Sequence, residues 1–197
     1  MTHDVNFQKE IIAKIKPIIS SWTEDDIYAI SFFVDDEADN PCEPTFTLGY
    51  NTEREYNSAL NSAYDELEAR WNYAFWQQNE ELVFGVGNTS EIVKQWILDK
   101  GLPYLTYDEM FQGDPIKNYS NIFDKRFEKI TIEFVNVLIN VVKELHETEF
   151  IKNKFGKEIP IIIHELEYYP QIAIQNIEAN TLPLVQGLSE FCGYCPE

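Results

Sequence analysis

Apolar positions recur at helical spacing in several stretches of the chain. The longest pattern runs from Phe123 to Leu145, where apolar residues step by three and four positions over about six turns. A second pattern ends near residue 22 and predicts an N-terminal helix that kinks or restarts at Pro17. A third helix is predicted to open at Thr52 in a capping box with Glu55 and to keep one apolar face as far as Trp71. Shorter helices are predicted for residues 90–100, 170–179 and 183–191.

Shorter apolar runs rich in β-branched and aromatic residues predict strands near 27–34, 45–50 and 159–164, with a short edge strand at 82–84. The first two are expected to pair across an acidic connection. Strands therefore cluster in two places instead of alternating with helices, which favours an α+β fold over a doubly wound α/β fold. We predict one α+β domain over residues 1–197, in which a small, mostly antiparallel sheet packs with several helices.

Composition places the chain among folded proteins of a reducing compartment. Hydrophobic residues make up 44% of the 197 positions, which is enough to build a core and argues against disorder. The first ten residues lack the basic start and apolar run of a secretory signal. No apolar stretch reaches the roughly 18 residues of a membrane span. The odd number of cysteines, three, does not suit a disulfide scaffold. We expect a cytoplasmic protein.

The charge balance is strongly acidic, with 34 Asp and Glu against 15 Lys and Arg and a net charge of −19. Such a chain repels phosphate backbones and anionic membranes, so neither nucleic acid nor a membrane is an expected partner. A basic protein is an expected partner, because opposite charge speeds association. Between Glu24 and Glu68 there are 13 acidic residues and one basic residue, Arg54, which predicts a one-sided acidic face. Solubility alone is the alternative interpretation.

An acidic loop follows the first predicted strand. It contains Asp35, Asp36, Glu37 and Asp39, and Glu43 comes shortly after. Clustered carboxylates are suited to Ca²⁺ or Mg²⁺, but the alternating acids and central glycine of an EF-hand are absent. A contact with a basic partner is the functional interpretation that we favour, and a solvated loop is the alternative.

A histidine stands beside carboxylates after the last predicted strand, in the sequence His164-Glu165-Leu166-Glu167. An imidazole in this setting can act as a general base or as a metal ligand. The spacing differs from the His-Glu-x-x-His of metalloproteases. One hypothesis places His164, Glu165 and Glu167 in one pocket with Asp35 and Asp36, around a divalent metal. A histidine that closes the strand with a hydrogen bond is the alternative.

Two further motifs invite a functional interpretation. Trp71 and Trp76, in an aromatic-rich stretch, are suited to anchor an interface or to fill the core. Cys192 and Cys195 have the spacing of a redox pair or of half a zinc site, but they lie at the end of the chain and two further zinc ligands are missing. Phosphate-binding glycine loops and nucleophile elbows are absent from the sequence. We therefore predict no catalytic residue, cofactor or metal.

Three segments carry a resemblance to a known family. They are Ile27-Tyr28-Ala29-Ile30-Ser31-Phe32-Phe33-Val34-Asp35-Asp36, Arg70-Trp71-Asn72-Tyr73-Ala74 and Ile163-His164-Glu165-Leu166-Glu167-Tyr168-Tyr169. The chain resembles, over most of its length, the bacterial domain of unknown function 4303. The resemblance implies a small cytoplasmic bacterial protein and supplies no catalytic residues. Similar small proteins are suspected antidotes to secreted toxins. The Cys192–Cys195 tail does not belong to the family pattern.

These observations lead to three hypotheses. The first is an acidic protein-binding module, in particular an immunity protein that neutralises a basic toxin such as a nuclease. The second is the enzyme built on the His164 and Asp35 segments, and the third is an oligomer that associates through the aromatic patch near Trp76. The residues predicted to bind a partner are Asp35, Asp36, Glu37, Asp39, Glu43, Trp71, Trp76, His164, Glu165 and Glu167.

Overall fold

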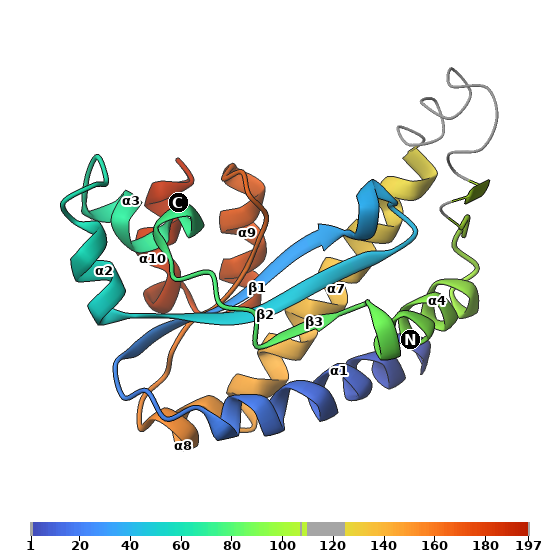
Figure 1. The fold of residues 1–197 in the computed structure, drawn as a ribbon, viewed down its shortest axis with the longest axis horizontal. Helices are drawn as coiled ribbons and strands as arrows, with labels where there is room; N and C mark the ends of the chain where they lie inside the picture. The colour runs from blue at the N-terminus through green and yellow to red at the C-terminus, as the bar shows by residue number, and fades with distance from the viewer. Residues whose placement is uncertain (1, 107, 110–124, 197) are drawn as a thin grey trace.

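The computed structural model describes residues 2–106, 108–109 and 125–196 (Figure 1). Four strands form one sheet: β1 (Ile27–Asp36), β2 (Pro44–Thr52), β3 (Leu82–Phe84) and β4 (Ile161–His164). The helices are α1 (Thr2–Ser21), α2 (Glu53–Ala59), α3 (Glu66–Trp71), α4 (Ser90–Asp99), α7 (Lys125–Glu147), α8 (Phe150–Phe155), α9 (Pro170–Ala179) and α10 (Leu182–Phe191). Short 3-10 turns lie at η1 (Glu37–Asp39), η2 (Tyr73–Phe75) and η3 (Gly87–Thr89).

The sheet has the order β3-β2-β1-β4. β1 and β2 form a long antiparallel hairpin, whose pairing runs from Ile27 opposite Thr52 to Asp36 opposite Pro44. β3 is an antiparallel edge strand, as predicted. β4 lies on the other side of β1 and runs parallel to it, with His164 opposite Phe33. The α+β class is confirmed, and the sheet is mixed because of β4.

Each face of the sheet packs against its own apolar cluster, because side chains alternate between the faces along a strand. On one face, Ile30, Phe32 and Val34 of β1 join a large cluster with α1, α4 and α7. On the other, Tyr28 and Ile162 join a smaller cluster to which α3, α9 and α10 contribute. Figure 1 shows α2, α3, α9 and α10 gathered over one end of the sheet. The acidic loop lies at the opposite end of the sheet, where β1 finishes.

The helix does not restart at Pro17, because α1 is continuous from Thr2 to Ser21. A proline inside a helix removes one backbone donor and clashes with the preceding turn. Here Ile11, Ile15 and Ile19 are completely buried on one side of the helix. The burial of this stripe, about 1.5–3 kcal/mol for each side chain, outweighs the local cost of the proline.

The single helix predicted from Thr52 to Trp71 is also wrong, because the segment forms two helices, α2 and α3. Its start is correct: Glu55 N–H donates to Thr52 Oγ1 at 3.2 Å. Tyr64, placed on the apolar face by its spacing, is 94% exposed. Asp65 caps a new helix by accepting from Glu68 N–H at 2.8 Å. The Asp65 cap competes locally with continuation of the first helix.

The other predicted elements lie close to where the sequence placed them. α4 ends before Gly101, whose φ of +66° ends the helix, and α9 begins with Pro170 in its first turn. α7 follows the long apolar pattern, although the predicted start at Phe123 lies outside the described residues. Within the ranges that the structure describes, no helix combines the length and the apolar character that crossing a membrane requires.

Candidate functional site

The parallel pairing of β1 and β4 brings two acidic segments together. β1 ends at Asp36 and β4 ends one residue before Glu165, and strands that run parallel finish at the same edge of a sheet. Asp35, Asp36, Glu165 and Glu167 consequently line one hollow of about 380 Å³ between the strand ends and α7. We name these four residues and the hollow the acidic cleft.

The acidic loop extends this cleft outward. Asp35, Glu37 and Asp39 are exposed, and Glu43 and Asp36 are partly buried. Asn40 anchors the loop: its side chain is fully buried and accepts a hydrogen bond from Cys42 N–H at 3.0 Å. We name the four cleft residues together with Glu37, Asp39 and Glu43 the acidic end of the sheet.

In the part of the chain that the structure describes, the carboxylates of the acidic end lack ion-pair partners: none of the seven pairs with a lysine or arginine. Burial, with help from the nearby charges of Asp35, Glu165 and Asp39, raises the pKa of Asp36 to about 7. Its Oδ1 is buried and has no hydrogen-bond partner. A cation bound here would therefore relieve a repulsion that the described residues leave uncompensated.

Glu165 shares this environment. Burial raises its pKa, and the charges of Asp35 and Glu167 act in the same direction. The Tyr169 hydroxyl donates to Glu165 Oε2 at 3.2 Å, which favours the ionised carboxylate. The cleft thus holds two carboxyl groups, Asp36 and Glu165, that are both harder to ionise than usual.

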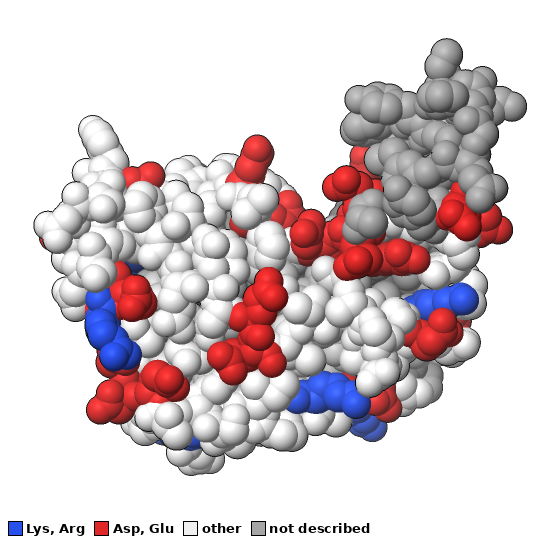
Figure 2. Space-filling view, in the orientation of Figure 1, with Lys and Arg blue, Asp and Glu red and all other residues white. Residues whose placement is uncertain are grey.

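The acidic residues between Glu24 and Glu68 do not form one face, which corrects the prediction. Asp35–Asp39 and Glu43 lie at one end of the β1–β2 hairpin, and Glu24–Asp26, Glu53 and Glu55 lie at the other. A ten-residue strand, about 33 Å long, separates the two groups. At the second end Arg54 pairs with Asp26 and Arg70 with Glu53. Figure 2 shows red side chains gathered where β1 passes into β2, with the blue ones elsewhere on that view.

His164 belongs to the interior. Its side chain is completely buried among Tyr73, Trp76 and Tyr168. Nδ1 lies 3.1 Å from the Glu165 carbonyl oxygen, which can only accept, so Nδ1 carries the proton. Nε2 then accepts from the Ser31 hydroxyl at 2.8 Å. Burial lowers the His164 pKa to about 4.

The His164 ring therefore closes the strand end, as the alternative interpretation had it. Both ring nitrogens are occupied, and the side chain reaches neither the solvent nor a carboxylate of the cleft. The catalytic arrangement of His164 with Asp35 and Asp36 is not formed. Among the residues that the structure describes, no group of histidine, cysteine and carboxylate side chains is arranged to hold a metal ion.

Trp71 and Trp76 are also interior, each 6% exposed, so their interpretation as interface anchors is corrected. Both fill the smaller apolar cluster. The Trp76 indole N–H donates to the Arg70 carbonyl oxygen at 2.9 Å, and the Tyr28 hydroxyl donates to the same oxygen at 2.6 Å. An interface anchored by the Trp76 indole itself would require its bond to the Arg70 carbonyl oxygen to break.

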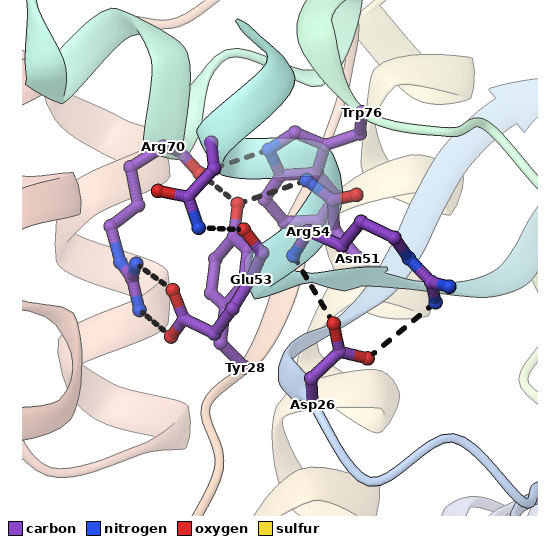
Figure 3. Close-up of polar contacts among 8 residues, drawn as sticks. Asp26, Tyr28, Asn51, Glu53, Arg54, Arg70 and Trp76 are labelled. Carbon is purple, nitrogen blue, oxygen red and sulfur yellow. Dashed lines mark hydrogen bonds and ion pairs between the residues drawn. The ribbon is translucent and has the colours of Figure 1, made fainter. Parts of the chain in front are cut away.

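The polar network around Arg70 fastens α2 and α3 to the hairpin (Figure 3). The Arg70 guanidinium donates two parallel bonds to Glu53, at 2.9 and 3.0 Å, and lies 4.0 Å above the Tyr28 ring. Asn51 donates to the Tyr28 hydroxyl at 3.0 Å. This network occupies the one arginine of α3 in a structural role.

Exposed apolar side chains, which the sequence pattern did not mark as functional, lie beside the acidic cleft. Leu166 is 72% exposed and lines the cleft between Glu165 and Glu167. Ile132 of α7 is 60% exposed and Tyr169 is 40% exposed. The sequence does contain a sign of the exposure of Ile132, because this apolar residue lies outside the repeating apolar face on which α7 is buried.

A second hollow of about 480 Å³ adjoins the cleft on the other face of the sheet. Phe33, Thr47 and Val83 are among the residues that form it, and Asp35 and Leu166 line both hollows. This is the part of the face that α3, α9 and α10 do not cover. The acidic end therefore combines negative charge with partly exposed apolar surface.

The three cysteines are free thiols. Cys192 is buried and Cys195 is exposed, and burial raises the Cys192 pKa to about 11. A reactive redox thiol needs a lowered pKa. The structure thus offers no specific support for a redox role of this pair.

The fold and the site together define an α+β protein with a four-stranded mixed sheet and an acidic cleft between two parallel strand ends. Comparison with protein-family models, with curated proteins and with solved structures found no match. The resemblance to the bacterial domain of unknown function 4303 therefore stays a prediction.

Proposed function

We propose that this protein is a binding module for a cationic protein, which it contacts through the acidic end of its sheet. One observation carries the proposal: seven carboxylates from two separate chain segments converge there without a lysine or arginine partner among the described residues. A partner's lysines and arginines would supply the missing charge. Charge of one sign on a limited surface speeds association and selects partners of the opposite sign.

The specific form of the proposal is an immunity protein that neutralises a basic toxin such as a nuclease. The active site of a nuclease attracts phosphates, and a surface of closely spaced carboxylates competes for the same basic groups. The net charge of −19 adds a long-range attraction to such a toxin. The enzymatic alternative is weaker, because its intended base, His164, is sealed in the interior.

Two variants of equal charge test the proposal. The first neutralises four exposed residues of the acidic end, with Asp35→Asn, Glu37→Gln, Asp39→Asn and Glu167→Gln. The second neutralises four exposed acids elsewhere, with Glu10→Gln, Asp25→Asn, Glu66→Gln and Glu147→Gln. Wild type and both variants serve as baits for capture from cells of the source organism, and association rates are measured with each captured protein after its purification.

We expect a basic protein to bind the wild type and the second variant at similar rates. Its association rate with the first variant should be at least tenfold lower. We also expect the wild-type rate to fall steeply when ionic strength rises from about 0.01 M to about 0.15 M, because the Debye length shrinks from about 30 Å to about 8 Å. Equal losses in the two variants, a rate that ignores salt, or capture of no basic protein would contradict the proposal.

A further inference from the structure

A groove continues from the acidic cleft along the surface between α7 and α9. It has a volume of about 480 Å³ and shares Thr131, Glu165 and Tyr169 with the cleft. From α7 it is lined by Ile132, Val135 and Ile139. These positions, spaced three, four and seven apart, make an apolar stripe along one side of α7.

Exposed apolar side chains concentrate around this groove. Nine large apolar residues are exposed in the part of the chain that the structure describes. Three of them line the groove or the adjoining cleft: Ile132, Leu166 and Tyr169. Ile174 lies on the same side of α9 as the groove residues Gln171 and Glu178, from which it is three and four positions away. Such a concentration is typical of an interaction surface.

We propose that this groove binds an amphipathic helix of the cationic partner, with the apolar face of that helix against α7 and α9 and its basic end at the acidic cleft. The inference rests on the proposed function and adds to it the kind of segment that is recognised. The stripe from Ile132 to Ile139 is about 10 Å long, which matches about two turns of a bound helix.

The shape of the groove favours a helix. The ridges of a bound helix fit the furrow between two adjacent helices, and amphipathic helices commonly bind apolar grooves in this way. Glu178, at the far end, already pairs with Lys143 at 2.9 Å. Asp36, Glu165 and Glu167, at the near end, have no such partner in the described ranges. Because only the carboxylates at the cleft end of the groove lack a cationic partner among the described residues, the basic residues of the bound helix should lie toward the cleft.

Charge disfavours a second copy of this chain as the occupant. A two-fold interface places the same surface of both copies face to face, so that carboxylates would oppose carboxylates. Each copy carries −19 overall, which adds to the repulsion.

The test uses two synthetic peptides of roughly 14 residues, about 21 Å long as helices. The first is amphipathic, with leucines along one face and lysines gathered at one end. The second has the same composition in an order that forms no apolar face. Binding is measured by fluorescence anisotropy at low ionic strength, with wild type, Ile132→Ser and the control Leu98→Ser. Leu98 is 49% exposed and lies on α4.

We expect the amphipathic peptide to bind the wild type about tenfold more tightly than the second peptide. Ile132→Ser should weaken binding of the amphipathic peptide about fivefold to tenfold, because one apolar contact is lost. Leu98→Ser should leave the affinity for this peptide unchanged. Backbone amide shifts induced by the first peptide should map to α7 and α9.

The outcomes separate the two proposals. Equal binding of both peptides, unaffected by Ile132→Ser, overturns the groove and leaves the acidic docking surface in place. Failure of both peptides to bind counts against the acidic surface itself. Self-association that Ile132→Ser abolishes, seen by sedimentation, or binding of uncharged lipid vesicles through the same residue, would assign the groove to another occupant and overturn the inference.

Discussion

At the scale of single residues, two titratable groups at neighbouring strand ends have pKa values moved in opposite directions. Asp36, at the end of β1, has its pKa raised from 3.8 to about 7 by burial and nearby carboxylates. His164, at the end of β4, has its pKa lowered from 6.5 to about 4 by burial. The folded protein thus favours the neutral form of each, and both affect how stability depends on pH.

The signs of the two effects are opposite. Because the folded state holds the Asp36 proton more tightly than the unfolded state, Asp36 makes the free energy of unfolding fall as pH rises from about 4 to about 7. Because the unfolded state protonates His164 first, His164 makes the free energy of unfolding fall as pH drops from about 6.5 toward 4. In the wild type the two trends partly cancel over the same interval.

The substitution Asp36→Asn should expose the trend of His164. We expect the free energy of unfolding to rise by roughly 1–3 kcal/mol above pH 7, an amount kept below the full value of the shift because Asp36 is partly exposed. Near pH 4 the variant should match the wild type. Urea denaturation at several pH values measures both, with the exposed Asp25→Asn as control. A gain that is independent of pH would refute this account of Asp36.

At the scale of secondary-structure elements, α9 seals the open edge of the sheet. β4 is an edge strand, and its outward backbone groups would otherwise lack partners. Asn176 accepts from Ile163 N–H at 2.8 Å and donates to Ile163 C=O at 2.7 Å. Asn180 does the same for Ile161, at 3.0 and 2.9 Å. These side-chain amides imitate a further strand.

The rise per residue of a helix and of a strand explains why two asparagines of α9 can pair with two residues of β4. Four residues of helix rise about 6.0 Å, and two residues of strand rise about 6.6 Å. Residues 176 and 180 therefore stay in step with 163 and 161. Gln175 adds a further bond to the Ile163 carbonyl oxygen at 2.9 Å. Helix, edge strand and acidic cleft are thus held together by the amides of one helix face.

The substitution Asn176→Asp tests this seal with almost no change in shape. It removes the donor to the Ile163 and Ile172 carbonyl oxygens and places an acceptor or a charge against them. We expect a loss of about 2–4 kcal/mol in the free energy of unfolding, because Asn176 is completely buried. Gln171→Glu, at an exposed position of the same helix, is the control for the added acid. Denaturation curves that coincide for the two variants would show that the amide bonds contribute little.

At the scale of the whole molecule, the net charge of −19 is unevenly paired. Lysines and arginines form ion pairs along α1, α4, α7 and the far end of the hairpin, for example Lys100 with Asp4 and Glu133 at 2.7 and 2.8 Å. The acidic end receives none in the described part of the chain. Repulsion there is a cost to folding that salt or a partner can reduce.

The two fourfold variants of equal charge also test this cost. In low salt, the acidic-end variant should melt at a higher temperature than the wild type, with a gain of roughly 1 kcal/mol from four carboxylates at a few tenths each. The second variant, in which exposed acids elsewhere on the surface are neutralised, should gain less stability. Added salt should reduce the difference in stability between the two variants. Differential scanning calorimetry across a salt series gives the comparison. Equal gains would show that only net charge matters.

The sequence by itself determined the elements whose signals are local. The long pattern of α7, the strands of the hairpin, the Thr52 cap and the proline that opens α9 were all readable, because backbone hydrogen bonding and side-chain spacing within a few residues decide them. The α+β class followed from their order. Carboxylates at 35–36 and 165–167 were recognised as candidates from their positions after strands.

Only the tertiary structure decided which of these residues meet. The parallel placement of β4 beside β1 joins two acidic segments, and it also buries His164 beneath Tyr73 and Trp76. Periodicity tells which side of an element is apolar, but not which neighbour covers it. For the same reason the exposure of Leu166 and Ile132 and the continuity of α1 through Pro17 depended on packing between segments distant in the chain.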